Sequence, residues 1–118
     1  MNDTHTLRRP PKQTPTLYSQ DGLGENALAF AHYFLPGSGA DWYITEYNPA
    51  EDIAFGWAEI VPGCGEWGYI SIAELEEISL PLVIDLGGEK LKSKYLMRVE
   101  LDLYWNVRPM REVLANRQ

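Results

Sequence analysis

The sequence is poor in the residues on which several kinds of function depend. It has one cysteine and two histidines in 118 residues, so an intramolecular disulfide is excluded and a cysteine-based zinc site has no second thiol. No apolar run approaches the roughly 20 residues of a membrane-spanning helix, and residues 1–15 lack the apolar stretch of a secretory signal. These absences predict a soluble cytoplasmic protein with no membrane contact, metal or cofactor.

Basic residues are missing from most of the chain. Between positions 13 and 89 there are thirteen Asp or Glu residues and no Lys or Arg, a charge of −13, while the two flanks carry +2 and +4, which gives the net −7. Any salt bridge to these carboxylates is therefore expected from the C-terminal third or from a partner. Because an acidic surface repels nucleic acid and attracts basic surfaces, we expect a basic protein partner and no direct nucleic-acid binding.

Nucleotide-binding signals are also absent. Gly22 and Gly24 lack the preceding strand and the following Lys-Ser or Lys-Thr of a phosphate loop. Aromatic platforms for single-stranded nucleic acid lie beside a basic groove, whereas here the aromatic stretch is also the acidic one. We therefore expect most of these rings in the core, with a few at an interface.

The length suits one domain, and the alternation of apolar residues predicts several strands. Gly- and Pro-containing turns separate them, and a Ser-Ile-Ala-Glu capping box at Ser71 predicts the start of a helix. We predict an α+β fold, an antiparallel sheet of about five strands with a short helix packed on it and a C-terminal helix. The expected strands are 27–34, 42–47, 53–58, 67–70, 82–86, 90–95 and 97–105, and the expected helices are 72–78 and a segment from about Pro109.

Composition also predicts the domain boundaries. Residues 1–16 are polar, contain Pro10, Pro11 and Pro15, and show no periodicity, which predicts a flexible N-terminal tail. Residues 17–118 are then a single α+β domain.

Several short motifs occur in a fixed order along the chain. They are Leu17-Tyr18-Ser19-Gln20-Asp21-Gly22, Trp42-Tyr43-Ile44-Thr45-Glu46-Tyr47, Phe55-Gly56, Glu66-Trp67-Gly68-Tyr69-Ile70-Ser71, Glu74-Leu75-Glu76 and Asp102-Leu103-Tyr104-Trp105. Together they resemble the bacterial domain-of-unknown-function family 2958 over roughly residues 17–112, and residues 80–98 differ from the family pattern as an inserted, Lys-bearing hairpin. The resemblance implies a small cytoplasmic accessory protein of plasmids, integrative elements or phages, without an assigned activity, and it supplies no catalytic residues.

Two sets of charged residues are candidate site residues. Neighbouring carboxylates can divide the roles of general acid and base, and they also serve as solvated surface charge. Lys90, Lys92 and Lys94 alternate, so they share one side of a strand, where lysines protect an edge from aggregation or contact an acidic surface. The acidic set comprises Glu46, Asp52, Glu66, Glu74, Glu76 and Glu77.

The leading hypothesis is an acidic interaction protein of a mobile element or phage. It would dock on a basic, nucleic-acid-binding surface of another protein, as an anti-restriction or anti-CRISPR inhibitor or a transfer regulator. The alternative is an enzyme with a pocket around Glu46, in which Tyr47 or Tyr69 and Asp52 converge. Opposite charges also leave self-association as a homodimer open.

Two isolated residues have ordinary interpretations. His32 has only His5 as a second histidine, so a partly buried strand histidine is favoured over a base or metal ligand. Cys64 lies in a Gly-rich turn and is interpreted as a loop cysteine.

Overall fold

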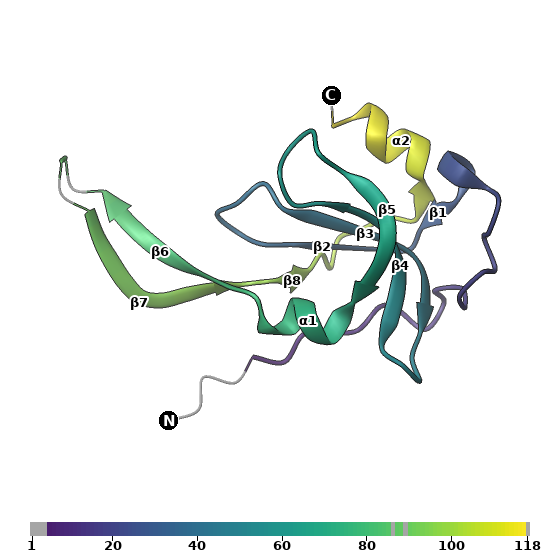
Figure 1. Cartoon of the computed structure of the whole chain (residues 1–118), viewed down its shortest axis with the longest axis horizontal. Helices are drawn as coiled ribbons and strands as arrows, with labels where there is room; N and C mark the ends of the chain where they lie inside the picture. The colour runs from purple at the N-terminus through teal and green to yellow at the C-terminus, as the bar shows by residue number, and fades with distance from the viewer. Residues whose placement is uncertain (1–4, 86, 89, 118) are drawn as a thin grey trace.

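The computed structural model describes residues 5–85, 87–88 and 90–117, and for residues 82–85 and 90–95 it describes the backbone but not the side chains. It shows a body of packed strands with two short helices, from which one long hairpin projects (Figure 1). The elements are a 3-10 helix at Gly24–Asn26, β1 Leu28–Ala29, β2 Ala31–Phe34, β3 Asp41–Asn48, β4 Ile53–Glu59, β5 Glu66–Ser71, α1 Ile72–Glu77, β6 Ser79–Asp85, β7 Lys90–Arg98, β8 Glu100–Leu101, β9 Arg108–Pro109 and α2 Met110–Ala115.

Five antiparallel strands form the main sheet, in the order β5-β4-β3-β2-β8. Short turns join its consecutive strands. The turn between β2 and β3 contains Gly37 at a φ of 81°, a left-handed conformation that glycine adopts without a steric penalty. The pairs β1-β9 and β6-β7 form separate two-stranded sheets. The predicted α+β architecture, with about five antiparallel strands and a C-terminal helix, is confirmed.

Helix α1 begins where the capping box predicted. The Ser71 hydroxyl accepts a hydrogen bond from the Glu74 backbone N–H at 3.2 Å, which satisfies one of the free donors of the first turn. The helix ends at Glu77, before Pro81. Ile72 and Leu75 form its buried side, so this short helix is stabilised mainly by packing on the sheet.

Strand β3 contains a bulge that decides which face its later side chains occupy. Ile44 pairs with Gly56 and Glu46 pairs with Phe55, so Thr45 is the extra residue. A Cβ atom on Gly56 would meet the Tyr43 carbonyl oxygen at 1.8 Å, so only glycine fits there. Past the bulge the alternation is reversed, and Glu46 lies on the face opposite to that of Ile44 and Tyr47.

Residues 5–15 lie across one face of the sheet, which we call the strap face. Leu7 is buried in the core with Tyr33 and Ile44, and its N–H donates to Glu76 Oε2 at 2.7 Å. The Tyr33 hydroxyl donates to the Arg8 carbonyl at 2.6 Å. The segment predicted to be a flexible tail is therefore packed on the sheet over its described part. Leu7 is buried and backbone groups of the segment form hydrogen bonds to the body, contacts that the polar composition did not indicate.

The opposite face, which we call the pocket face, has a second and smaller core. Helix α2 buries Met110 and Val113 there against Ala29 and Tyr43. Indole rings surround this cluster, and the Trp105 Nε1–H donates to the Ala29 carbonyl at 2.9 Å. Because α2 covers only part of this face, the rest remains available for a site.

The hairpin expected at 80–98 occupies residues 79–98 and projects from the body (Figure 1). Its strands pair from Ser79 with Arg98 to Asp85 with Lys90, with an irregularity between Pro81 and Val83. The side chains of Lys90, Lys92 and Lys94 lie outside the described residues.

The strand expected over residues 97–105 is shorter than predicted. β7 ends at Arg98 and β8 covers only Glu100–Leu101. Asp102 then turns the chain, because its Oδ1 accepts from the Tyr104 N–H at 3.0 Å. Such local side-chain bonds compete with strand pairing, and Tyr104 is consequently 91% exposed.

Candidate functional site

A concave site of about 410 Å³ lies on the pocket face, within the size range of small-ligand pockets. One wall is the loop that contains Tyr18 to Gly24, and the base is formed by β3, β4 and β5. We call it the aromatic pocket. Its four aromatic rings and two carboxylates belong to Tyr18, Phe55, Trp67, Tyr69, Asp21 and Glu46.

Glu46 connects the sheet to the loop wall. Glu46 is only 4% exposed, and its two carboxylate oxygens accept hydrogen bonds from the backbone N–H groups of Tyr18 at 2.8 Å and Gln20 at 2.7 Å. The Gln20 amide in turn donates to the Thr45 carbonyl at 2.8 Å and accepts from the Leu28 N–H at 2.7 Å. The β3 bulge and these bonds together hold a negative charge at the base of the pocket.

Two tyrosines form the rim. Their hydroxyl oxygens are 3.2 Å apart, although Tyr18 and Tyr69 are 65% and 61% exposed. This hydrogen bond raises the pKa of the Tyr69 hydroxyl. Tyr18 has a φ of 73°, a conformation that is uncommon for a residue with a side chain and is found preferentially at ligand sites.

The remaining rings form the wall on β4 and β5. Phe55 and Trp67 are nearly parallel with centroids 6.1 Å apart, and Phe55 meets Tyr69 edge-on at 76° and 5.4 Å. Ring faces carry negative electrostatic potential and attract cations. In the described part of the chain, no Lys or Arg lines the pocket, so rings and carboxylates favour the same sign of ligand.

Asp52 and Glu76 belong to a different cluster, on the strap face. Arg9 binds Asp52 Oδ2 at 2.7 Å and Glu76 Oε2 at 2.7 Å, and the Tyr47 hydroxyl donates to Asp52 Oδ1 at 2.5 Å. Burial pushes the pKa of Asp52 up, but the hydrogen bonds from Arg9 and Tyr47 outweigh it and leave the pKa below its ordinary value. Asp52 and Tyr47 therefore do not converge with Glu46.

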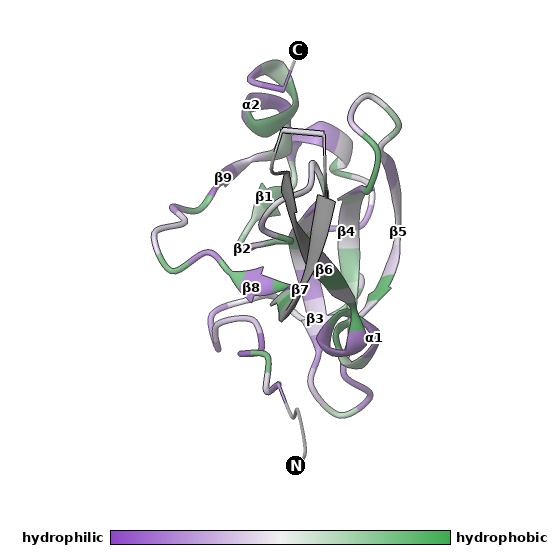
Figure 2. Cartoon of the chain, turned by 90° about the vertical axis from the view of Figure 1, so that its left-hand side faces the viewer, coloured by the Kyte–Doolittle hydropathy of each residue, from purple (hydrophilic) through white to green (hydrophobic). Residues whose placement is uncertain are grey.

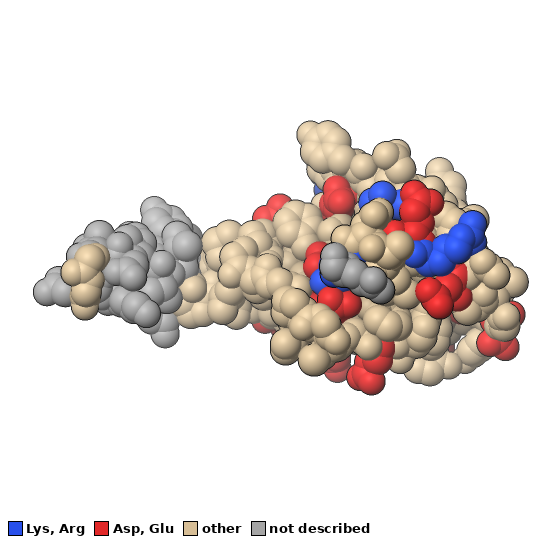
Figure 3. Space-filling model, turned by 90° about the horizontal axis from the view of Figure 1, so that it is seen from above, with Lys and Arg blue, Asp and Glu red and all other residues tan. Residues whose placement is uncertain are grey.

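The other predicted acids are exposed at separate places. Glu66 begins β5, and Glu74 and Glu77 lie on α1, which follows the other end of that strand. On the face seen in Figure 3, acidic side chains occur in several groups with basic ones between them. Glu46 and Tyr69 are thus the only members of the predicted sets that the described structure brings into the aromatic pocket.

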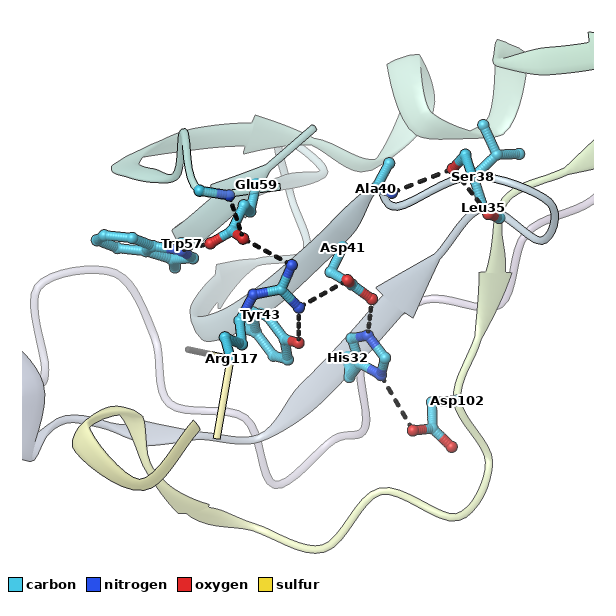
Figure 4. Close-up of polar contacts among 11 residues, drawn as sticks. His32, Leu35, Ser38, Ala40, Asp41, Tyr43, Trp57, Glu59, Asp102 and Arg117 are labelled. Atoms are coloured by element: carbon cyan, nitrogen blue, oxygen red, sulfur yellow. Dashed lines mark hydrogen bonds and ion pairs between the residues drawn. The ribbon is translucent and has the colours of Figure 1, made fainter. Parts of the chain in front are cut away.

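A second polar cluster on the pocket face was not predicted. Arg117 reaches Asp41 Oδ2 and Glu59 Oε2 at 2.7 Å each, and the Tyr43 hydroxyl at 2.8 Å (Figure 4). The hydrogen bond from Arg117 lowers the pKa of Glu59 to about 2 despite the opposing effect of burial, and the Gly63 N–H assists. Sequence spacing gives no signal for contacts between residues so far apart.

His32 lies beside this cluster. Its Nε2 is 2.6 Å from Asp41 Oδ1 and its Nδ1 is 3.0 Å from Asp102 Oδ2 (Figure 4), and the ring stacks on Tyr43 with centroids 4.7 Å apart. The expectation of a partly buried strand histidine is confirmed. Among the described residues, no group of three or more His, Cys, Asp or Glu side chains is arranged to hold a metal ion, and Cys64 is an exposed free thiol.

No helix in the described part of the chain has the length and apolar character needed to cross a bilayer. No curated protein and no solved structure matches the chain significantly. A family model does match it, over residues 13–93, which include the loop wall and every strand that lines the aromatic pocket. The chain therefore belongs to the family described as proteins of unknown function, DUF2958.

Proposed function

We propose that this protein is a non-enzymatic interaction protein that binds a basic protein partner by taking one of its cationic side chains into the aromatic pocket. The observation that carries the proposal is the composition of the pocket. Four aromatic rings and two carboxylates converge there, and no basic side chain lines it in the described part of the chain.

The carboxylate of Glu46 supplies the electrostatic argument. It is buried, and in the described structure its two oxygens accept hydrogen bonds from two neutral backbone N–H groups rather than from a cation. Charge buried without a counterion is costly, so a cation entering the pocket gains attraction to Glu46 and to Asp21 at the rim. The ring faces add about 0.5–2 kcal/mol for a desolvated ammonium or guanidinium.

An enzymatic pocket around Glu46 is less well supported. Asp52 and Tyr47, its expected partners, lie on the strap face with Arg9. Apart from the tyrosines, Thr45 is the only hydroxyl among the lining residues, all of which are described, and it donates to the Phe55 carbonyl at 3.1 Å. A nucleophile beside a general base is therefore not found among these residues.

The biological setting forms part of the same proposal. A cytoplasmic protein of a mobile element or phage that binds a basic side chain of another protein would act as an anti-restriction or anti-CRISPR inhibitor, or as a regulator of element transfer. Support comes from the family resemblance and from the absence of Lys and Arg between positions 13 and 89. A homodimer held by opposite charges is the competing mode of association.

Binding of a single capped lysine tests the proposal. N-acetyl-lysine methylamide is titrated into the protein and followed by tryptophan fluorescence and amide chemical shifts, with N-acetyl-norleucine methylamide as the uncharged comparison. We expect saturable, millimolar, salt-sensitive binding of the lysine probe only. The Asp21→Asn variant should bind it at least threefold more weakly, because one pocket charge is lost.

Glu77→Gln is the matched control, since it removes the same charge from the exposed end of α1. It should leave lysine binding unchanged. Equal binding of the two probes, or equal weakening by the two variants, would contradict the proposal, because either result would show that the pocket charge does not select the ligand.

A further inference from the structure

Strand β5 is an open edge beside the aromatic pocket. It pairs with β4 on one side, and the described part of the chain places no strand on its other side. Figure 2 shows β5 as the outermost strand of the sheet at this edge. An exposed strand edge offers N–H and C=O groups to which an extended segment of another protein can bind.

Two hydrogen bonds establish which residues of β5 face that edge. The Ile72 N–H donates to the Asp52 carbonyl at 3.2 Å. In an antiparallel pair every second residue bonds to the neighbouring strand, so Ile70 and Gly68 also bond to β4. The N–H and C=O groups of Trp67 and Tyr69 then point outward.

A hydrogen bond on the other side of β3 leads to the same assignment of the outward-facing residues of β5. The Ile44 carbonyl accepts from the Phe30 N–H at 2.8 Å, away from β4, so its neighbour Gly56 bonds to Gly68 on β5. No hydrogen bond in the described structure joins the outward groups of Trp67 and Tyr69 to another segment.

The same two residues line the aromatic pocket with their side chains. In an antiparallel sheet, side chains directly opposite each other lie on the same face, with Cβ atoms about 4.5–5.5 Å apart. A residue added opposite Trp67 or Tyr69 therefore projects over the pocket. The residue whose backbone binds the edge is also the residue whose side chain enters the site.

We infer that the partner binds as an extended segment added antiparallel to β5, with a lysine or arginine opposite Trp67 or Tyr69 inserted into the aromatic pocket. This inference rests on the proposed function and specifies its ligand. Backbone hydrogen bonds supply affinity and the pocket supplies selection for a cationic side chain. Charge complementarity argues for a basic segment, since Glu66, Asp21 and Glu46 surround the edge and the pocket.

A second copy of the β5 edge is a poorer occupant. Residues 66–71 contain Glu66 and no basic residue, so a second β5 edge would bring no cationic side chain to either pocket.

The test uses an acetylated, amidated five-residue peptide with lysine at the centre of alternating valine and threonine. The peptide is made in two isomers, each with one methyl group on a backbone nitrogen. In the first isomer the methyl group is on the lysine backbone nitrogen, which should face β5 and bond to it. In the second it is on the backbone nitrogen of the next residue, which should face away from β5. We expect the first isomer to bind at least tenfold more weakly than the second. In the peptide complex, amide exchange of Trp67 and Tyr69 should slow at least tenfold, while Gly68 is unchanged.

Equal affinity of the two isomers, or unchanged exchange at Trp67 and Tyr69, would overturn strand addition. If the lysine peptide still outcompetes its norleucine counterpart in that case, the proposed function stands without the strand. If the norleucine peptide binds equally well and protects the same amides, strand addition stands and the pocket proposal fails. A dimer that protects both amides in the free protein would overturn the choice of partner.

Discussion

Each face of the sheet has one arginine that binds two carboxylates, and the two arginines come from opposite ends of the chain. On the strap face, Arg9 is 34% exposed and its partners Asp52 and Glu76 are 26% and 27% exposed. On the pocket face, Arg117 is 19% exposed, with Asp41 at 19% and Glu59 at 7%. The arginine–carboxylate ion pairs are thus more exposed to water on the strap face than on the pocket face.

This difference changes the interpretation of the acidic middle of the chain. Four of its carboxylates are partners of these two arginines, so part of the −13 charge is balanced within the molecule. The sequence led us to expect such cations only from the C-terminal third or a partner, and Arg9 corrects that expectation. Removing one partner of a buried ion pair destabilises a protein more than removing one partner of an exposed pair, so we expect larger effects on the pocket face than on the strap face.

Replacement of Arg117 should have the largest effect. The Arg117→Met variant leaves Glu59 and Asp41 without their cation in a largely buried position, and we expect a loss of about 2–4 kcal/mol in the free energy of unfolding. Urea denaturation followed by tryptophan fluorescence measures it. Arg111→Met in α2, the helix that precedes Arg117, removes only an exposed bond to Asn26 and should change stability by less than about 0.5 kcal/mol.

Acid should remove part of the same interaction. The pKa of Glu59 lies at about 2 in the folded protein, below its unfolded value, so its pairing stabilises the fold above about pH 4.5. That contribution is lost as the pH falls toward 2, because the unfolded state then binds the proton more readily. Glu59→Gln should be less stable at pH 7 and should lose less stability between pH 5 and 2. Parallel stability curves for the two proteins would contradict this assignment.

Replacement of Arg9 should have a smaller effect than that of Arg117. We expect Arg9→Met to cost about 1–2 kcal/mol, because water partly solvates Asp52 and Glu76 after the change. Arg8→Met, an exposed neighbour in the strap, is the control and should be nearly neutral. A cost for Arg9→Met equal to that for Arg117→Met would show that exposure does not distinguish the two faces.

The helices on the two faces provide the mildest comparison. α1 has a side-chain cap from Ser71, whereas α2 follows Pro109 and has no side-chain cap bond. Ser71→Ala should therefore cost about 1 kcal/mol, measured by thermal or urea denaturation. The exposed Ser79→Ala in β6 is the control, and an equal cost for both variants would argue against a capping role.

Local signals in the sequence predicted much of the fold. The Gly-containing turns, the alternating strands and the capping box at Ser71 each specify structure over a few residues, and the structure has the corresponding hairpins and α1. The predicted strand through Trp105 failed because the turn at Asp102 depends on one side-chain bond, which alternation does not report.

The site was harder to predict because it depends on contacts between distant residues. Glu46 was singled out from its sequence surroundings, but its face depends on the bulge at Thr45. An unbroken alternation would have placed Thr45 opposite Phe55 and Glu46 on the strap face. The Arg9 and Arg117 clusters join residues 43 to 76 positions apart, and composition cannot indicate which cation meets which carboxylate.

The bulge gives β3 two frames of side-chain alternation, one up to Ile44 and another from Glu46. A residue's position along this strand therefore does not by itself say whether it faces the strap or the pocket. In a chain of this fold without the extra residue, the acidic residue would have to stand at position 45 instead of 46 for its carboxylate to lie in the pocket. The length of β3 up to the bulge is thus as much a requirement of the site as the carboxylate itself.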